Sequence, residues 1–268
     1  MALLERLSSA RAQLPLLALL CFLYAASLMG LPLTGGALRL GLANYAFMQL
    51  VYLADRYFAP AEDAANGVRP PEPLPVPGSV FFFALAAAAA YIASFPRQWV
   101  FPAAGLLLFF LYSFPPLGRL RLKNFFLSKT LINASLFTAA VTFSPALLRW
   151  GAEPPVLAAV ARAAAGMFPA ALCLTVLLDV RDAAGDAAAG VRTLPVVLGA
   201  RRASLGVAVL AAAAGLLAWH GGSRFGTAFY AVLAGASLFA AGRGRLYFEG
   251  CLLALNLLAA CALFGGWR

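Results

Sequence analysis

The stretch LLDVRDAAGDAAAGVRTLPVVLG, residues 177–199, places Asp179, Asp182 and Asp186 at the end of a long apolar run. The chain has only 10 acidic residues among 268, so three within eight positions are a strong concentration. If the preceding helix continues through them, the carboxylates share one stripe of its surface, because side chains three and four residues apart are helix neighbours. Like charges at that spacing repel. The stretch therefore predicts a compensating cation at the end of an apolar helix.

The rest of the chain is too apolar for an ordinary soluble domain. Hydrophobic residues make up 63% of it and charged residues only 11%, whereas about 25% of residues are charged in soluble proteins. Runs of about 20 apolar residues, enough for a helix to cross a bilayer core, recur along the whole length. We therefore predict an all-α membrane protein with a single domain over residues 1–268. The nine expected transmembrane segments cover roughly 13–33, 38–57, 78–96, 98–115, 125–145, 155–178, 203–220, 226–242 and 248–266.

The distribution of basic residues predicts the orientation of these segments. Of the 20 Lys and Arg residues, 14 fall on the side that holds the N-terminus, which the positive-inside rule places in the cytoplasm. An odd number of spans then puts the C-terminus outside. The net charge of +10 is explained by this bias and does not indicate nucleic-acid binding. The alanine-rich, arginine-over-lysine composition suggests a bacterial inner membrane protein. The first apolar run is long and lacks a clear cleavage site, so it is read as a retained helix.

A second acidic loop lies on the same predicted face. This loop, residues 55–78, is the longest between apolar segments and carries four acids. Together the two loops hold seven of the ten acids: Asp55, Glu62, Asp63, Glu72, Asp179, Asp182 and Asp186. Carboxylates without histidine or thiolate neighbours suit Mg²⁺, and the four cysteines lack metal-site spacing and are expected to be packing residues. The predicted metal ligands are Asp55, Asp63, Asp179, Asp182 and Asp186.

Basic and polar side chains near these loops suit an anionic substrate. Guanidinium groups pair with phosphate through two hydrogen bonds, so Arg69, Arg181 and Arg192 are expected to meet phosphates. Two alternatives stay open for Lys129, which is either functional or snorkels to the interface. Tyr112 either faces the site or belongs to the interfacial aromatic belt.

These groups together predict a site for a lipid-like diphosphate. Mg²⁺ and the basic side chains would hold the diphosphate, and a cavity with apolar walls would hold the hydrocarbon tail. Loss of diphosphate would leave an allylic cation. The cations stabilise the leaving group, and a water-poor pocket protects the cation from hydrolysis.

The stretch RDAAGDAAAGVRTLPVVLG, residues 181–199, resembles the second aspartate motif, RDxxxDxxxGxRTLxVxLG, of the UbiA family of intramembrane prenyltransferases. It resembles especially the branch that makes precursors of menaquinone and related quinones. The resemblance implies a bundle of nine transmembrane helices around a central apolar cavity. It also implies that Asp182 and Asp186 bind Mg²⁺ on a prenyl diphosphate, with Asp179 adjacent and Arg192 at a basic position of the family.

The first aspartate motif of that family, NxxxDxxxD followed by Asn and Arg-Pro, is altered in this chain. The stretch DRYFAPAEDAANGVRP, residues 55–70, aligns through Asp63, Asn66 and Arg69. This alignment puts Asp55 at the Asn position and Ala59, which has no ligand atoms, at the middle Asp. Two further basic residues, Arg119 and Lys123, match those that follow the fourth helix in the family. We therefore expect catalysis at Asp182, Asp186 and Lys123, and substrate binding at Asn66, Arg69, Tyr112, Arg119, Lys123, Arg181 and Arg192.

Several functions remain open at this point. The favoured one is Mg²⁺-dependent transfer of a prenyl group from a polyprenyl diphosphate to a lipophilic acceptor, such as an aromatic quinone precursor. A membrane terpene cyclase would quench the cation internally or with water, and a non-catalytic member, favoured by Ala59, would only bind prenyl lipid. A transporter is disfavoured, because transporters bind substrate near the bilayer midplane and these acids gather at one face. The acceptor, the prenyl chain length and the oligomeric state are not indicated by the sequence.

Overall fold

The protein is described by a computed structural model over residues 12–33, 35–58, 64–66, 79–113, 121–148 and 155–265. These residues form helices and contain no strand. The long helices are α2 (Gln13–Leu28), α3 (Gly36–Phe58), α5 (Ser79–Ser94), α6 (Val100–Ser113), α7 (Ser128–Thr138) continued by α8 (Ser144–Leu147), α9 (Pro155–Ala188), α11 (Ala200–His220), α12 (Arg224–Leu238) and α13 (Arg245–Phe264). All nine predicted apolar segments are therefore helical.

Membrane crossing is supported for part of this set. Within the described residues, four helical stretches are long and apolar enough to span a bilayer: Ser128–Leu147, Leu157–Ala188, Ala200–His220 and Arg245–Phe264. Three shorter apolar helices are Gln13–Leu28, Phe82–Ser94 and Val100–Tyr112. The number of nine membrane passes, and the direction in which they run, stay predictions.

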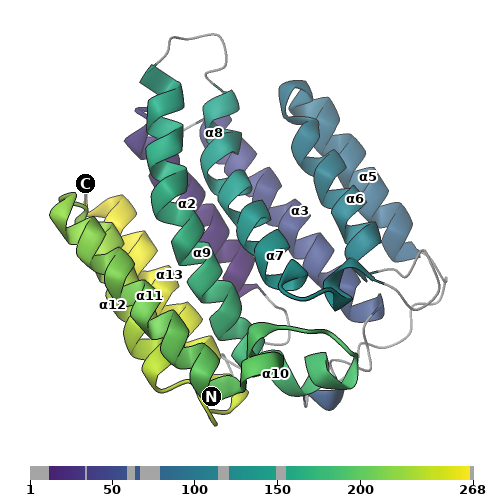
Figure 1. Cartoon of the computed structure of the whole chain (residues 1–268). Coiled ribbons are helices and arrows are strands. Elements are labelled where there is room, and N and C mark those ends of the chain that lie inside the picture. The colour runs from purple at the N-terminus through teal and green to yellow at the C-terminus, as the bar shows by residue number, and fades with distance from the viewer. Residues whose placement is uncertain are drawn as a thin grey trace.

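The helices run side by side, with α5 and α6 at one edge of the bundle and α11, α12 and α13 at the other (Figure 1). Between these edges, α9 packs on α7 and α11, and α2 packs on α13 and α3. Outward-facing side chains are often large and apolar, and Leu217 and Phe264 are 74% and 84% exposed. A surface of this kind is stable in lipid, where apolar side chains lose nothing by exposure.

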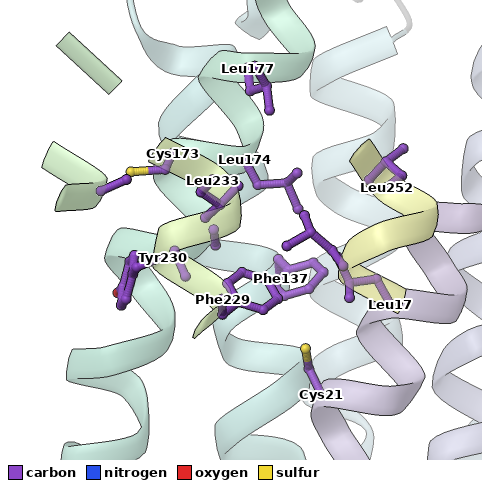
Figure 2. Close-up of a cluster of buried hydrophobic side chains, with 14 of the residues drawn as sticks. Leu17, Cys21, Phe137, Cys173, Leu174, Leu177, Phe229, Tyr230, Leu233 and Leu252 are labelled. Atoms are coloured by element: carbon purple, nitrogen blue, oxygen red, sulfur yellow. The ribbon is translucent and has the colours of Figure 1, made fainter. Parts of the chain in front are cut away.

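The main hydrophobic core joins helices that are distant in sequence. Leu17 of α2, Phe137 of α7 and Leu252 of α13 converge beside α9 and α12 (Figure 2). Cys21 and Cys173 are buried in the same core as free thiols. These two cysteines are therefore packing residues, as their spacing predicts.

Helix α9 carries the acidic stretch of the second motif. It has 34 residues and, at about 1.5 Å per residue, is roughly 50 Å long, so it continues well past the length of a bilayer core. The helix continues past the apolar segment expected at roughly 155–178 and runs to Ala188, which places all three aspartates on its last turns. Gly190, at φ +72°, ends it in the left-handed conformation that glycine adopts most easily.

The start of α7 is fixed against the same motif. Leu127 has φ +62°, a conformation that costs free energy for a residue with a branched side chain. Its backbone N–H donates to the carbonyl of Arg192, at 3.3 Å. This contact sets α7 beside the end of α9, and the helix begins at Ser128 rather than at the predicted residue 125. A π-helical turn, Ala139–Phe143, follows α7. It precedes Pro145, which lacks an N–H for the hydrogen bonds of the helix.

Candidate active site

A cavity of about 280 Å³ runs between the helices. All five acidic residues in the described part of the chain line it: Asp55, Asp179, Asp182, Asp186 and Glu249. Four cations line it as well: Lys123, Lys129, Arg181 and Arg245. We call this part, near the ends of α3 and α9 and the start of α13, the carboxylate end. Most other lining side chains are apolar, among them Leu19, Phe22, Phe47, Leu108 and Phe137.

Lys129 joins two of the three aspartates of the second motif. Its Nζ lies 2.7 Å from both carboxylate oxygens of Asp186 and 3.2 Å from Oδ1 of Asp179. The hydroxyl of Thr130 donates to the other oxygen of Asp179 at 2.7 Å, and both aspartates are only 2% exposed. The repulsion expected among the acids is thus offset in part by a lysine of α7, whose ammonium group points at the carboxylates.

Arg181 links the third aspartate to an acid on another helix. Its Nε and Nη2 each donate to one oxygen of Asp182 at 2.8 Å. Its Nη1 donates to Oε1 of Glu249 at 3.3 Å. Glu249 also lies 3.8 Å from Nε of Arg245 and accepts a 2.9 Å hydrogen bond from Nε2 of Gln13.

The sequence analysis missed Glu249, Arg245 and Gln13. A signal was available for two of them, since Arg245 and Glu249 are four residues apart near the start of an apolar segment. Ionisable residues in such segments face the bundle interior and pair with one another. Nothing in the sequence marks Gln13, whose role depends on α2 lying against α13.

Other predicted site residues also reach this end. The side-chain oxygen of Asn66 accepts a 2.7 Å hydrogen bond from the backbone N–H of Gly185. Lys123 is 2% exposed, and its Nζ lies 5.5 Å from the centre of the Tyr112 ring. The amide of Asn133 donates to the Tyr112 hydroxyl at 3.4 Å. Tyr112 therefore lines the cavity rather than standing only in an interfacial belt.

The remaining predictions divide into two groups. The side chain of Arg192 is exposed and does not line the cavity, so its contact with phosphate stays a prediction. Asp63, Arg69, Arg119 and the altered position Ala59 lie outside the described residues. The structure therefore does not test the first aspartate motif beyond Asp55 and Asn66.

The ligand chemistry of the carboxylate end fits Mg²⁺. Among the described residues, no group of three or more His, Cys, Asp or Glu side chains converges on one point. Mg²⁺ does not need such a cage, because it is usually held by one or two carboxylates together with water and substrate phosphates. Asp182 and Asp186 both line the cavity and present hard oxygen donors.

Asn44 and Tyr91 line the opposite end of the cavity, which we call the far end, and belong to a neutral polar network. The hydroxyl of Tyr91 donates to Oδ1 of Asn44 at 2.6 Å. Nδ2 of Asn44 donates to the Ser144 hydroxyl at 3.0 Å, which donates onward to Oε1 of Gln98 at 3.3 Å. Asn44 precedes Asp55 by 11 residues on α3, so the two ends are about 16 Å apart along that helix.

Comparison with known proteins assigns the family. The model of the UbiA prenyltransferase family matches residues 76–250, which include the second aspartate motif. The chain belongs to this family. The resemblance that the motif indicates is thus confirmed, and membership makes it an integral membrane protein. The UbiA match begins after the altered first motif, residues 55–70.

A solved structure supports the UbiA-type bundle. The chain is similar to a structure described as a UbiA homolog from Archaeoglobus fulgidus bound to DMAPP and Mg²⁺. The identity is 16%, the TM-score is 0.62, and the match covers 97% of each chain. At this identity the likeness shows the fold alone. No curated protein sequence matches the chain.

Proposed function

We propose that this UbiA family member is a Mg²⁺-dependent intramembrane prenyltransferase. It transfers a prenyl group from a polyprenyl diphosphate to a lipophilic acceptor, such as an aromatic quinone precursor, and releases diphosphate. The observation that carries the proposal is the cavity itself. Every described acid and four cations line one part of it, while most of its remaining wall is apolar. A diphosphate head with a hydrocarbon tail matches that division of polarity.

The residues of the carboxylate end have separate roles in this proposal. Asp182 and Asp186 hold Mg²⁺, with Asp55, Asp63 and Asp179 as further ligands or neighbours. When bound, Mg²⁺ supplies positive charge that stabilises the oxygens of the leaving diphosphate. The basic residues Arg69, Arg119, Lys123, Arg181 and Arg192 neutralise the remaining phosphate charge. Asn66, held to α9 through Gly185, positions the loop that carries it.

The chemistry follows from the placement of these groups. The bond between C1 of the prenyl chain and its diphosphate oxygen breaks, and both bonding electrons leave with the oxygen. Lys123, which is buried against Tyr112, is a preorganised charge for that leaving group. The apolar walls exclude water from the allylic cation that remains. The acceptor then attacks C1.

The proposed setting follows the sequence analysis. The enzyme lies in the inner membrane of a bacterium with its N-terminus in the cytoplasm. Diphosphate donors are water-soluble at the head, so the carboxylate end opens to the cytoplasmic side in this proposal. Accessibility of single cysteines, introduced at exposed Arg202 of α11 and at Arg224 of α12, to an impermeant thiol reagent tests the orientation. Labelling of position 224 alone from the cytoplasm would contradict it.

The first experiment measures diphosphate release by purified protein in lipid. Geranyl, farnesyl and geranylgeranyl diphosphates are each offered with and without Mg²⁺ and with and without a panel of aromatic acceptors. We expect release that requires both Mg²⁺ and an acceptor. Asp182→Asn and Asp186→Asn are expected to lower the rate by roughly 10²- to 10³-fold, the usual loss when one charge-stabilising group is removed. Exposed Arg202→Gln is the control and should retain the rate.

Other outcomes separate the rival functions. Release without an acceptor identifies a cyclase or hydrolase. Saturable binding without release by any donor supports a non-catalytic member, in which case Ala59→Asp should not create turnover. Full Mg²⁺-dependent turnover in both aspartate variants would overturn the assignment of the site.

A further inference from the structure

Glu249 is the one described acid outside the two acidic stretches, residues 55–78 and 177–199. It comes from α13, is 3% exposed and lines the same cavity as the other four acids. A carboxylate in such a place is costly unless it is paired, and buried ionisable groups in membrane helices are functional candidates. The proposed binding of Mg²⁺ and diphosphate assigns no role to Glu249.

The side chain of Gln13 places a further hydrogen-bond acceptor beside Glu249. Its Nε2 donates to Oε2 of Glu249 at 2.9 Å, and this contact fixes the amide, because the flipped amide would set two acceptor oxygens against each other. The other atom, Oε1 of Gln13, is then a buried acceptor that receives no hydrogen bond from the described residues. An orphaned buried acceptor calls for an explanation such as a bound donor group.

The carboxylate of Glu249 also has acceptor capacity left. A carboxylate offers about four lone-pair positions. The hydrogen bonds from Arg181 and Gln13 occupy two of these positions, and Arg245 lies at the longer distance of 3.8 Å. This part of the cavity wall is therefore rich in hydrogen-bond acceptors. It suits a ligand that brings donors, an O–H or an N–H.

The position of Glu249 relative to the proposed diphosphate site is set by one side chain. The guanidinium of Arg181 bonds to Asp182 through Nε and Nη2 and to Glu249 through Nη1. The two carboxylates are therefore separated by the width of a single guanidinium group. A ligand bound to Glu249 lies next to a diphosphate held near Asp182.

We propose that Glu249 and Gln13 form the acceptor subsite, and that the acceptor carries a hydroxyl or amino group that donates to Glu249. This inference rests on the proposed function. After the C1–O bond of the prenyl diphosphate has broken and diphosphate has left with the bonding electrons, the acceptor forms its bond to C1 of the allylic cation. The electron pair comes from the heteroatom or, in a phenol, from a ring carbon, and the O–H or N–H proton passes to the Glu249 carboxylate. Attack by a ring carbon first gives a dienone, whose ring proton then moves to the oxygen to restore the phenol.

The two arginines beside Glu249 are compatible with this role. Arg181 and Arg245 pair with the Glu249 carboxylate at 3.3 and 3.8 Å, and an unpaired carboxylate would be unstable in an apolar bundle. The proton of the acceptor becomes strongly acidic as its heteroatom or ring loses electrons to C1, so a paired carboxylate can take it. A base needs first of all to lie within hydrogen-bond reach of that proton.

The test separates the acceptor step from donor binding. Full-length Glu249→Gln protein in lipid is compared with wild type for two quantities: the equilibrium binding of farnesyl diphosphate with Mg²⁺, and the rate of transfer to the acceptor. We expect binding to change less than threefold, and transfer to fall by roughly 10²- to 10⁴-fold, the usual contribution of a positioned base. Gln13→Leu should raise the KM for the acceptor while leaving donor binding intact. Arg202→Gln is the control for the loss of a charge.

A second measurement needs no variant and covers the case in which Glu249→Gln fails to fold. A phenol acceptor and its methyl ether are offered to the wild-type enzyme. The ether lacks the donor and should be neither prenylated nor able to compete with the phenol. Equal use of phenol and ether would overturn the inference.

Three further outcomes would contradict the inference. A parallel loss of donor binding and transfer in Glu249→Gln would show that Glu249 only holds Arg181 for the diphosphate, and would also overturn the inference. Failure of the wild type to bind any prenyl diphosphate would defeat the proposed function first, and this inference with it. Normal donor binding with unimpaired transfer in the variant would defeat this inference alone.

Discussion

The two ends of the cavity hold their polar side chains in opposite ways. At the carboxylate end the groups are acidic and basic, and ion pairs join three helices, α7, α9 and α13, across the bundle. At the far end the groups are neutral. There a chain of hydrogen bonds runs from Tyr91 through Asn44 and Ser144 to Gln98.

This difference distinguishes polar side chains that stabilise the bundle from polar side chains that have a chemical role. A neutral network whose donors meet acceptors stabilises the bundle and requires nothing from a ligand. A charged cluster in an apolar bundle is often less stable than apolar packing of the same shape. The presence of a charged cluster at one end only is therefore best explained by a role in binding or catalysis. In the proposed function, the carboxylate end binds and activates the substrate, and the far end serves stability.

The largest expected effect on stability comes from removing Lys129. Lys129→Met leaves Asp179 and Asp186, both 2% exposed, without the cation that contacts them. Breaking a buried ion pair in this way costs about 3–5 kcal/mol of unfolding free energy. Thermal unfolding in lipid or detergent measures the loss.

A double variant checks the cause of that loss. Lys129→Met with Asp186→Asn removes one of the two unpaired charges and should recover part of the stability. Removal of an exposed charge, as in Arg201→Gln, should change little. If Lys129→Met unfolds at the wild-type temperature without added Mg²⁺, the ion pairs at this end contribute no stability, and the contrast between the ends is wrong.

Much of the carboxylate end is predictable from sequence, because its signals are local. The spacing of Asp179, Asp182 and Asp186 places them on one helical stripe once the helix continues, and α9 does continue. Hydropathy fixes the helices for the same reason, since each segment carries its own signal. The glycine at 190 also marks the end of α9 by a local conformational need.

The rest depends on packing between distant segments. The bond from Gln13 to Glu249 joins residues 236 positions apart, and the bond from Lys129 to Asp186 joins residues 57 apart. Periodicity along the sequence does not predict such pairs. Arg192 shows that a residue inside a recognisable motif need not line the site. It follows Gly190 in the turn after α9, and its exposed side chain is directed by that turn rather than by the motif to which it belongs.

The wall between the two ends should set the length of the prenyl chain, if the proposed function holds. The ring of Phe47 packs on Gly105 so closely that a Cβ at Gly105 would lie 2.7 Å from its Cε1. Phe47→Ala opens this part of the cavity, and we expect the rate ratio of geranylgeranyl to farnesyl diphosphate to rise roughly 10-fold, the lower range for pocket discrimination by size. Competition between the two donors measures the ratio.

Gly105→Ala is the matched opposite change. It adds a methyl group where Phe47 already packs, so the same ratio should fall. If both variants move the ratio in one direction, the tail does not pass Phe47. If neither moves it, the tail ends before reaching this wall, and the far end has no part in the choice of donor.

The smallest expected effect is at the far end itself. Tyr91→Phe removes the donor to Oδ1 of Asn44 but keeps the ring that packs near Phe47 and Phe95. Loss of one neutral hydrogen bond costs about 1 kcal/mol, well below the loss expected for Lys129→Met. The Mg²⁺ concentration for half-maximal rate should stay unchanged, because no charge near the metal ligands is altered. Thermal unfolding and a Mg²⁺ titration of the same preparation measure both quantities.

A stability loss as large as that of Lys129→Met would mean that neutral and charged clusters are held equally strongly in this bundle. A shifted Mg²⁺ requirement would mean that the two ends are coupled through α3, which carries both Asn44 and Asp55.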